Sequence, residues 1–184
     1  MKKTVVINLY GGPGAGKSTL AAELYYKMKK SGHSVELVRE YVKDWAWENR
    51  KVEQYDQIYI TGKQAKRETS LYSKVDYIIT DSPLLLSPFY GEHYSGIDYI
   101  LPSVLGLMDH ASENGVSYRH YLLKRNKQYV SEGRYETEAQ AKGIDWDMTE
   151  FLEKHEVPFL YLDVEDTEKA DWILSHLKAA GDLE

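Results

Sequence analysis

Residues 11–18 read Gly-Gly-Pro-Gly-Ala-Gly-Lys-Ser and decide the fold class of this 184-residue chain. They match the pattern G-x-x-x-x-G-K-[ST], with Gly11, Gly16, Lys17 and Ser18 at its fixed positions. An apolar run precedes the match and a helical pattern follows it, as a phosphate-binding loop requires. Glycines let successive backbone N–H groups turn inward, so that these donors and the helix N-terminus bind polyphosphate. The alternative is a glycine-rich turn with an incidental lysine.

Two side chains of the motif have predictable tasks. Lys17 is expected to reach the β- and γ-phosphates of a nucleotide, and the Ser18 hydroxyl is expected to bind Mg²⁺. The guanine-reading sequence Asn-Lys-x-Asp has its nearest match at residues 126–129, Asn-Lys-Gln-Tyr, where the carboxylate is missing. The transporter signature Leu-Ser-Gly-Gly-Gln is absent from the sequence, and the chain is short for a ring motor. Among the phosphate-loop classes, a kinase remains.

Apolar runs and helical patterns alternate along the chain. Strands are expected at residues 5–9, 35–40, 75–80, 118–123 and 158–162. Helices are expected at residues 17–30, 53–73, 102–112, 137–155 and 167–180. Thr137 and Gln140 form a capping box that opens the fourth of these helices. Strands separated by helices predict a single three-layer α/β domain over residues 1–184, with a five-stranded parallel sheet covered on both faces.

Two segments have weaker patterns. In the helix expected at residues 53–73, which is mostly polar, Ile58, Ala65 and Leu71 are expected to face the core. Residues 83–101 are rich in Pro, Gly, Ser and Tyr, and they are therefore expected to be mostly loop.

Composition excludes several classes of protein. The chain carries 23 Lys+Arg against 29 Asp+Glu, a formal charge of −6, and it has no cysteine. It therefore has no disulfide framework, zinc finger of the Cys type, iron–sulfur cluster or thiol nucleophile. A net acidic chain is a poor duplex-DNA binder by bulk charge. The first apolar run is too short for a signal peptide and no stretch approaches the ~20 residues of a membrane span, so we expect no membrane partner and a cytoplasmic location.

Two carboxylates follow predicted strands, at the edge where open α/β sheets bind ligands. Asp81 ends a run with the form of a Walker B strand and is expected to hold Mg²⁺. The alternative for Asp81 is a helix or turn cap through Ser82-Pro83. Glu40 ends the strand after the phosphate-loop helix and is expected to accept or orient the proton of an attacking hydroxyl. The alternative for Glu40 is a solvated carboxylate paired with Arg39 or a lysine.

Residues 41–72 interleave flat rings with amide and cationic side chains. The expected contacts to a base-like acceptor are Tyr41, Trp45, Tyr59, Lys63 and Arg67, with Trp47 and Tyr55 in the same stretch. Rings stack on a base while guanidinium and amide groups bind its edge. The alternative is that these rings pack a tyrosine-rich helix against the sheet.

Residues 124–134 hold four basic groups and one acidic group in an otherwise acidic chain. A cationic lid at about residues 124–136 is therefore expected to close over a nucleotide and stabilise the transferring phosphoryl group. The alternative is a solvated basic loop. The six histidines show no paired metal spacing and receive no role.

Several longer stretches are typical of one group of proteins. They are the loop region at 8–19, Val-Arg-Glu-Tyr at 38–41, Asp-Gln-Ile-Tyr at 56–59, Ile-Thr-Asp-Ser-Pro-Leu-Leu-Leu at 79–86 and Gly-Arg-x-x-Thr-Glu at 133–138. With them, the chain resembles small P-loop kinases of nucleosides and nucleotides over nearly its whole length. It is similar to the ribosylnicotinamide kinase domain and to phage proteins of the AAA-family ATPase kind. Some of these phage relatives resemble kinases that phosphorylate 5-hydroxymethyluracil in phage DNA.

The resemblance implies ATP and Mg²⁺ as cofactors and a P-loop kinase sheet in the order 2-3-1-4-5, with a lid. It implies that the ATP phosphates contact Gly12, Gly14, Ala15, Gly16, Lys17, Ser18 and Thr19. It further implies that Asp81 is the acidic metal position, that Glu40 is the acceptor-side carboxylate, and that Arg125 and Arg134 are the lid arginines. Deoxynucleoside kinases place an arginine directly after the acidic residue, whereas Ser82 follows here. That arginine must then come from the lid or from Arg67.

Taken together, the sequence predicts an ATP-dependent phosphotransferase. Its γ-phosphate acceptor is expected to be a hydroxyl or phosphate of a small nucleoside- or nucleotide-like molecule. A kinase acting on the 5-hydroxymethyl group of uracil in phage DNA is the first alternative, and the location is then the host cytoplasm. A non-kinase module switched by ATP is the second, although Glu40 and the basic lid favour a kinase. The oligomeric state, monomer or dimer, stays open.

Overall fold

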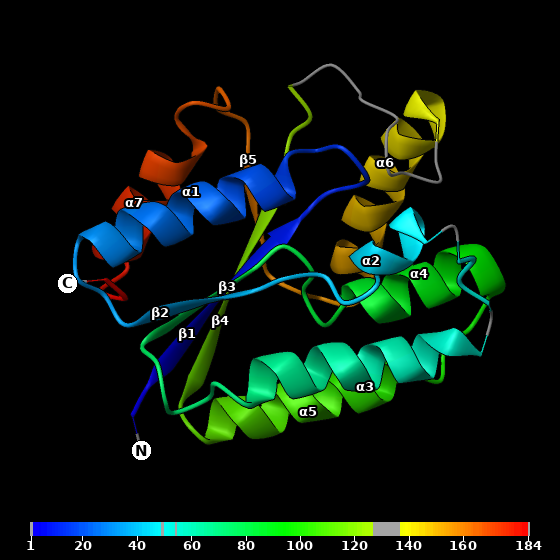
Figure 1. Cartoon of the computed structure of the whole chain (residues 1–184), viewed down its shortest axis with the longest axis horizontal. Coiled ribbons are helices and arrows are strands. Elements are labelled where there is room, and N and C mark those ends of the chain that lie inside the picture. The colour runs from blue at the N-terminus through cyan, green and yellow to red at the C-terminus, as the bar shows by residue number, and fades with distance from the viewer. Residues whose placement is uncertain (1, 49, 54, 127–136, 184) are drawn as a thin grey trace.

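One parallel sheet organises the chain in the computed structural model, which describes residues 2–48, 50–53, 55–126 and 137–183. The strands in these residues are β1 Thr4–Tyr10, β2 Val35–Val38, β3 Tyr77–Thr80, β4 Val116–Leu123 and β5 Leu160–Leu162. Their order is β2-β3-β1-β4-β5, and every neighbouring pair is parallel. This arrangement confirms the predicted order 2-3-1-4-5. It also places β1, which leads into the phosphate loop, at the centre of the sheet (Figure 1).

Helices cover both faces of the sheet. They are α1 Lys17–Lys30, α2 Lys43–Trp47, α3 Asp56–Thr69, α4 Leu86–Ser95, α5 Leu101–Glu113, α6 Glu138–Lys154 and α7 Lys169–Ala179. Helices α1 and α7 lie on one face, and α3 and α5 lie on the other (Figure 1). The three-layer α/β fold class is therefore confirmed. Among the described residues, none of the helices combines the length and hydrophobicity that crossing a bilayer requires.

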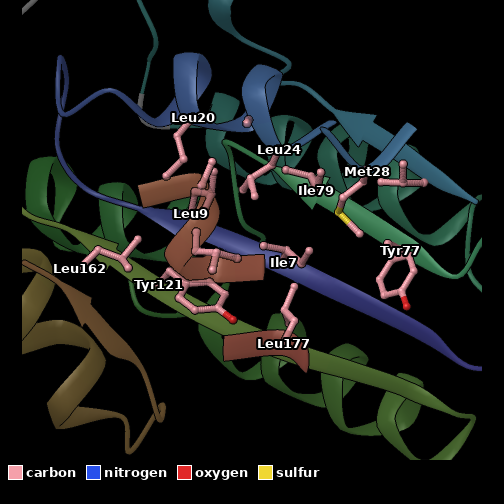
Figure 2. Packing of buried hydrophobic residues seen from close by; sticks show 14 of the residues in the cluster. Ile7, Leu9, Leu20, Leu24, Met28, Tyr77, Ile79, Tyr121, Leu162 and Leu177 are labelled. Atoms are coloured by element: carbon pink, nitrogen blue, oxygen red, sulfur yellow. The ribbon is translucent and has the colours of Figure 1, made fainter. Parts of the chain in front are cut away.

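The alternation of side chains along β1 divides the core in two. Ile7 and Leu9 point to the side of α1 and α7, where they pack in one cluster with Leu24 and Leu177 (Figure 2). Tyr10 is fully buried in a second cluster on the opposite face. Since successive residues of a strand point to opposite faces, a strand buried on both faces reads as one apolar run. The central strand that carries the phosphate loop is thus fixed from both sides.

The start of α6 has the predicted capping box. The Thr137 hydroxyl accepts a hydrogen bond from the Gln140 backbone N–H, and the Gln140 side chain accepts one from the Thr137 backbone N–H. Two N–H groups without partners in the helix are satisfied in this way. The cap fixes where α6 begins, and α6 later proves to contact the phosphate loop.

Two sequence predictions about local structure are wrong. Residues 83–101 are not mostly loop, because α4 spans Leu86–Ser95. Pro88 lies in the first turn of that helix, where its missing N–H costs nothing, and tertiary packing of the buried Phe89 stabilises it. Ile58 does not face the core but is 61% exposed, while Ile60 is buried. The other buried residues of α3 are polar, but Ala65 and Leu71 pack against the core as predicted, so the apolar spacing failed only at Ile58.

A buried polar cluster connects α3 to the central strands. Glu68 is fully buried and accepts a hydrogen bond from the Tyr72 hydroxyl at 2.6 Å, and that hydroxyl lies 2.9 Å from the Tyr118 hydroxyl. Burial raises the pKa of Glu68 to about 7. Nearby, His120 Nδ1 lies 2.9 Å from the Tyr10 hydroxyl, and burial lowers the pKa of His120 to about 4. The cluster orients α3, whose outer residues contribute to the candidate site.

Candidate active site

The phosphate loop connects the end of β1 to the first turn of α1. Gly16 is the residue before α1 and has φ 94, a left-handed conformation that side chains disfavour. No acidic residue lies in the first turn of α1. The N–H groups and the positive end of the helix dipole at this turn therefore suit an anion such as a phosphate.

Lys17 lies across the loop. Its Nζ donates hydrogen bonds to the carbonyl oxygens of Gly11 at 2.5 Å and Gly12 at 3.1 Å. Ser18 and Thr19 are exposed in the first turn of α1, so their hydroxyls are accessible to a ligand. These positions agree with the predicted phosphate and metal contacts, which remain predictions.

Asp81 and Glu40 meet at the carboxyl ends of the neighbouring strands β3 and β2. Asp81 is only 5% exposed, and its Oδ1 accepts a hydrogen bond from the Glu40 backbone N–H at 3.1 Å. The helix-cap part of the alternative for Asp81 has no support, because α4 begins after Leu85 without a side-chain cap. The Glu40 side chain is half-buried. Two adjacent strand ends therefore bring the Asp81 carboxylate next to the backbone of Glu40.

The donor set around the loop fits Mg²⁺ only in part. Ser18 offers a hydroxyl and Asp81 a carboxylate, which are hard oxygen ligands of the kind that Mg²⁺ takes. Within the described ranges, no group of three or more His, Asp or Glu side chains is arranged to hold a metal. Mg²⁺ commonly keeps several waters and substrate phosphates as ligands, so two protein ligands are enough for a nucleotide-dependent site.

Three rings after β2 form what we call the ring cluster, consisting of Tyr41, Trp45 and Tyr59. The hydroxyls of Tyr41 and Tyr59 lie 2.9 Å apart, and this hydrogen bond raises the pKa of Tyr41 and lowers the pKa of Tyr59. Trp45 and Tyr59 are stacked with centroids 6.4 Å apart. The Tyr41 backbone N–H donates to Gln64 Oε1 at 3.0 Å, which ties the cluster to α3. The cluster directly follows Glu40 in the chain.

Each ring of the cluster carries a cation. Arg67 lies over Tyr41 with its Cζ 4.9 Å from the ring centroid, and Lys63 Nζ lies 5.3 Å from the centroid of Tyr59. Arg50 stacks on Trp45 at 3.4 Å from the centroid, and Trp45 is only 6% exposed. The five residues predicted to contact the acceptor, the three rings with Lys63 and Arg67, thus lie together. Tyr59 is 46% exposed and accessible to an acceptor, whereas an acceptor would reach the Trp45 face only by displacing Arg50.

Only the first part of the predicted lid is described. Arg134 and residues 127–136 lie outside the described residues. Lys124 Nζ pairs with Asp163 at 2.6 Å, and the Asn126 side chain donates to the Val164 carbonyl at 2.8 Å. Arg125 is 8% exposed, and its Nε pairs with Asp145 of α6 at 2.8 Å. Residues 124–126 are therefore held by the loop after β5 and by α6, and the role of Arg125 at a phosphate remains a prediction.

A cavity of about 240 Å³ lies where β4, β5 and α6 meet. Its polar lining includes Lys124, Arg125, Lys142, Asp145 and Tyr161. Asp145 also contacts the phosphate loop, since its Oδ1 accepts a hydrogen bond from the Gly12 backbone N–H. The three basic side chains of this lining are each paired with a carboxylate, Lys124 with Asp163, Arg125 with Asp145 and Lys142 with Glu138.

Sequence reasoning missed two residues of this region, Arg50 and Asp145. Arg50 lies between the predicted strand at 35–40 and the predicted helix at 53–73, where no periodicity marks its partner. Asp145 is 133 positions from its partner Gly12, so no local spacing connects them. A usable signal was Gly12 itself, a second glycine at a position that the loop motif leaves open.

Comparison with known proteins agrees with this description. The family model described as AAA domain matches residues 6–169. No curated protein matches the sequence.

Solved kinase structures share the fold. The deoxyadenosine kinase from M. mycoides, with the products dCMP and dCDP bound, has a TM-score of 0.60 at 19% identity, covering 95% of this chain and 99% of that chain. The thymidylate kinase from Ehrlichia chaffeensis has a TM-score of 0.60 at 12% identity, with coverages of 96% and 99%. A variant of the Mycobacterium tuberculosis APS kinase has a TM-score of 0.54 at 13% identity, with coverages of 97% and 99%. At these identities the likeness concerns the fold.

Proposed function

The chain belongs to the AAA domain family, and from its site we propose that it is an ATP-dependent kinase of nucleoside- or nucleotide-like acceptors. The observation that carries the proposal is the adjacency of a donor side and an acceptor side. The phosphate loop follows the central strand β1, and Asp81 follows its neighbour β3. Asp81 bonds the backbone of Glu40, which the ring cluster follows directly. Solved kinase structures have a similar fold, which supports the proposal that this chain is a kinase.

The residues of the chain divide the reaction between them. The loop N–H groups and Lys17 bind the phosphates and stabilise the charge that spreads over the transferring phosphoryl group. Ser18 and Asp81 would hold Mg²⁺, which would supply further neutralisation of the phosphates. Glu40 accepts the proton of an attacking hydroxyl, and the ring cluster with Lys63 and Arg67 orients a flat, anionic or polar acceptor.

Removing either proposed metal ligand should change the Mg²⁺ requirement. We expect Asp81→Asn and Ser18→Ala each to raise the Mg²⁺ concentration for half-maximal rate roughly tenfold, since each weakens one hard oxygen ligand. Rates are measured across a Mg²⁺ titration at saturating ATP. Asp76→Asn is the matched control, because Asp76 precedes β3 at its opposite end and pairs with Lys2 on the surface. An unchanged Mg²⁺ dependence in both variants would show that Ser18 and Asp81 are not the metal ligands.

An acceptor screen tests the proposal itself. The full chain is incubated with γ-labelled ATP and nucleosides, nucleoside monophosphates, or DNA containing hydroxymethylated pyrimidine. We expect label to move to a small acceptor, with an acceptor KM that rises little between roughly 50 and 200 mM salt. Label in the polymer alone, with a steep salt dependence, would identify a DNA-base kinase instead. ATP hydrolysis without transfer to any acceptor would favour an ATP-switched module.

A further inference from the structure

The carboxylate of Asp145 joins three segments that are far apart in the chain. Its Oδ1 accepts a hydrogen bond from the Gly12 backbone N–H in the phosphate loop at 2.6 Å. Its Oδ2 accepts one from Arg125 Nε, just after β4, at 2.8 Å. The Asp145 side chain is 23% exposed and that of Arg125 is 8% exposed, so the contacts are largely shielded from water. Helix α6 is thereby fastened to the loop through one side chain.

The approach of α6 to the loop is close enough to require glycine at position 12. A Cβ on Gly12 would lie 2.7 Å from Asp145 Oδ1 and 2.8 Å from the Ala141 carbonyl oxygen. Both distances are below those of ordinary contacts, and one of the neighbours is backbone that cannot move aside cheaply. The contact thus depends both on the glycine at position 12 of the loop and on the residues that α6 places against it.

We propose that Asp145 is a positioning residue for the phosphate loop. The inference rests on the proposed binding of ATP by this loop. Loop N–H groups bind phosphate well only when their directions are set before the ligand arrives. The Asp145 bond fixes the peptide between Gly11 and Gly12, and the carbonyl of that peptide, that of Gly11, also accepts a hydrogen bond from Lys17 Nζ. The bond therefore sets the loop and the orientation of its lysine.

The proposal also explains why a carboxylate is tolerated beside a polyphosphate site. An isolated negative charge there would repel ATP, because shielding from water strengthens electrostatic interactions. The pairing with Arg125 offsets this charge while leaving Oδ1 to accept from Gly12. Arg125 thus has a second task, separate from the lid role that the sequence predicts.

Binding of a non-hydrolysable ATP analogue to the full chain tests the proposal. We expect Asp145→Ala to weaken binding about tenfold, the scale of a lost charge-assisted hydrogen bond, and Asp145→Asn, which keeps an acceptor oxygen, to stay within about threefold of the parent. Asp147→Ala is the matched control, a carboxylate on the same helix that pairs with His93 instead. Unchanged binding in a folded Asp145→Ala protein, or equal losses in both Asp145 variants, would overturn the proposal.

Two further measurements do not depend on activity. Arg125→Gln should weaken analogue binding, and the double variant Arg125→Gln/Asp145→Asn should recover part of it, because the uncompensated carboxylate is gone. In the unmodified protein, the Gly12 amide proton should be shifted downfield in NMR spectra and protected from hydrogen exchange. An ordinary, unprotected Gly12 amide would overturn the proposal even if Asp145→Ala fails to fold. A parent chain that binds no ATP analogue would instead refute the proposed function.

Discussion

Replacing Lys17 with alanine should lower phosphoryl transfer by at least about 10³-fold. The Lys17 ammonium lies over the loop, bonded to the carbonyls of Gly11 and Gly12, where the proposed phosphates bind. Negative charge spreads over the transferring group in the transition state, so a missing cation costs more there than in the ground state. The measurement is kcat and kcat/KM with labelled ATP and the acceptor that the screen identifies.

The fold should survive the Lys17→Ala change, because the side chain is only partly buried and the bonds described for it are to loop carbonyls. Thermal unfolding of the variant is compared with that of the parent chain. Lys30→Ala is the matched control, since Lys30 is exposed at the other end of the same helix and should leave the rate unchanged. Full activity in a folded Lys17→Ala protein would contradict the kinase proposal.

The sheet was predictable because β1 and its partners are buried on both faces. A strand such as Thr4–Tyr10 then appears as a mostly apolar run, and the loop motif that follows it fixes the direction of the chain. The capping box at Thr137 and Gln140 marks the start of α6 in the same local way. Features that depend only on neighbouring residues in the chain could therefore be predicted from the sequence.

Helix α4 and the buried polar side chains of α3 could not be predicted from the sequence, because tertiary contacts determine them. Residues Leu86–Ser95 contain Pro88, Gly91 and several poor helix formers, yet the helix is stabilised by packing in the second core cluster. The inner face of α3 includes Gln64 and Glu68, whose partners lie on other elements or follow the helix. A hydrophobic pattern cannot find a face whose buried side chains are polar.

In the candidate site, too, the residues at strand ends were predictable and the contacts between distant side chains were not. Asp81 and Glu40 were predicted from their positions at strand ends, and the hydrogen bond between them follows from the adjacency of β2 and β3. The stacking of Arg50 on Trp45 and the Asp145–Gly12 contact were missed, because each depends on how separate segments pack. Strand ends are fixed by topology, whereas such side-chain pairs are fixed only by the assembled fold.

We propose that Glu40 acts on the acceptor rather than on ATP. Its backbone N–H bonds Asp81, which holds the start of its side chain beside the proposed metal carboxylate, and the ring cluster begins at the next residue. A hydroxyl acceptor must lose its proton as it attacks, and a half-buried carboxylate at this position can take it. The ATP phosphates, in contrast, are proposed to bind to the loop after β1. A change of charge at Glu40 should therefore affect the chemical step more than nucleotide binding.

We expect Glu40→Gln to lower kcat by about 10²- to 10⁴-fold with little change in the KM for ATP, because the amide keeps the shape of the side chain and cannot accept a proton. Steady-state kinetics with a hydroxyl acceptor measures both constants. Glu36→Gln on the same strand is the matched control, since Glu36 pairs with Lys29 at the surface. An equal loss of ATP affinity would make Glu40 a neighbour of the metal or a structural residue. A near-normal rate would move the base elsewhere, with Asp44 and Asp56 the next carboxylates to test.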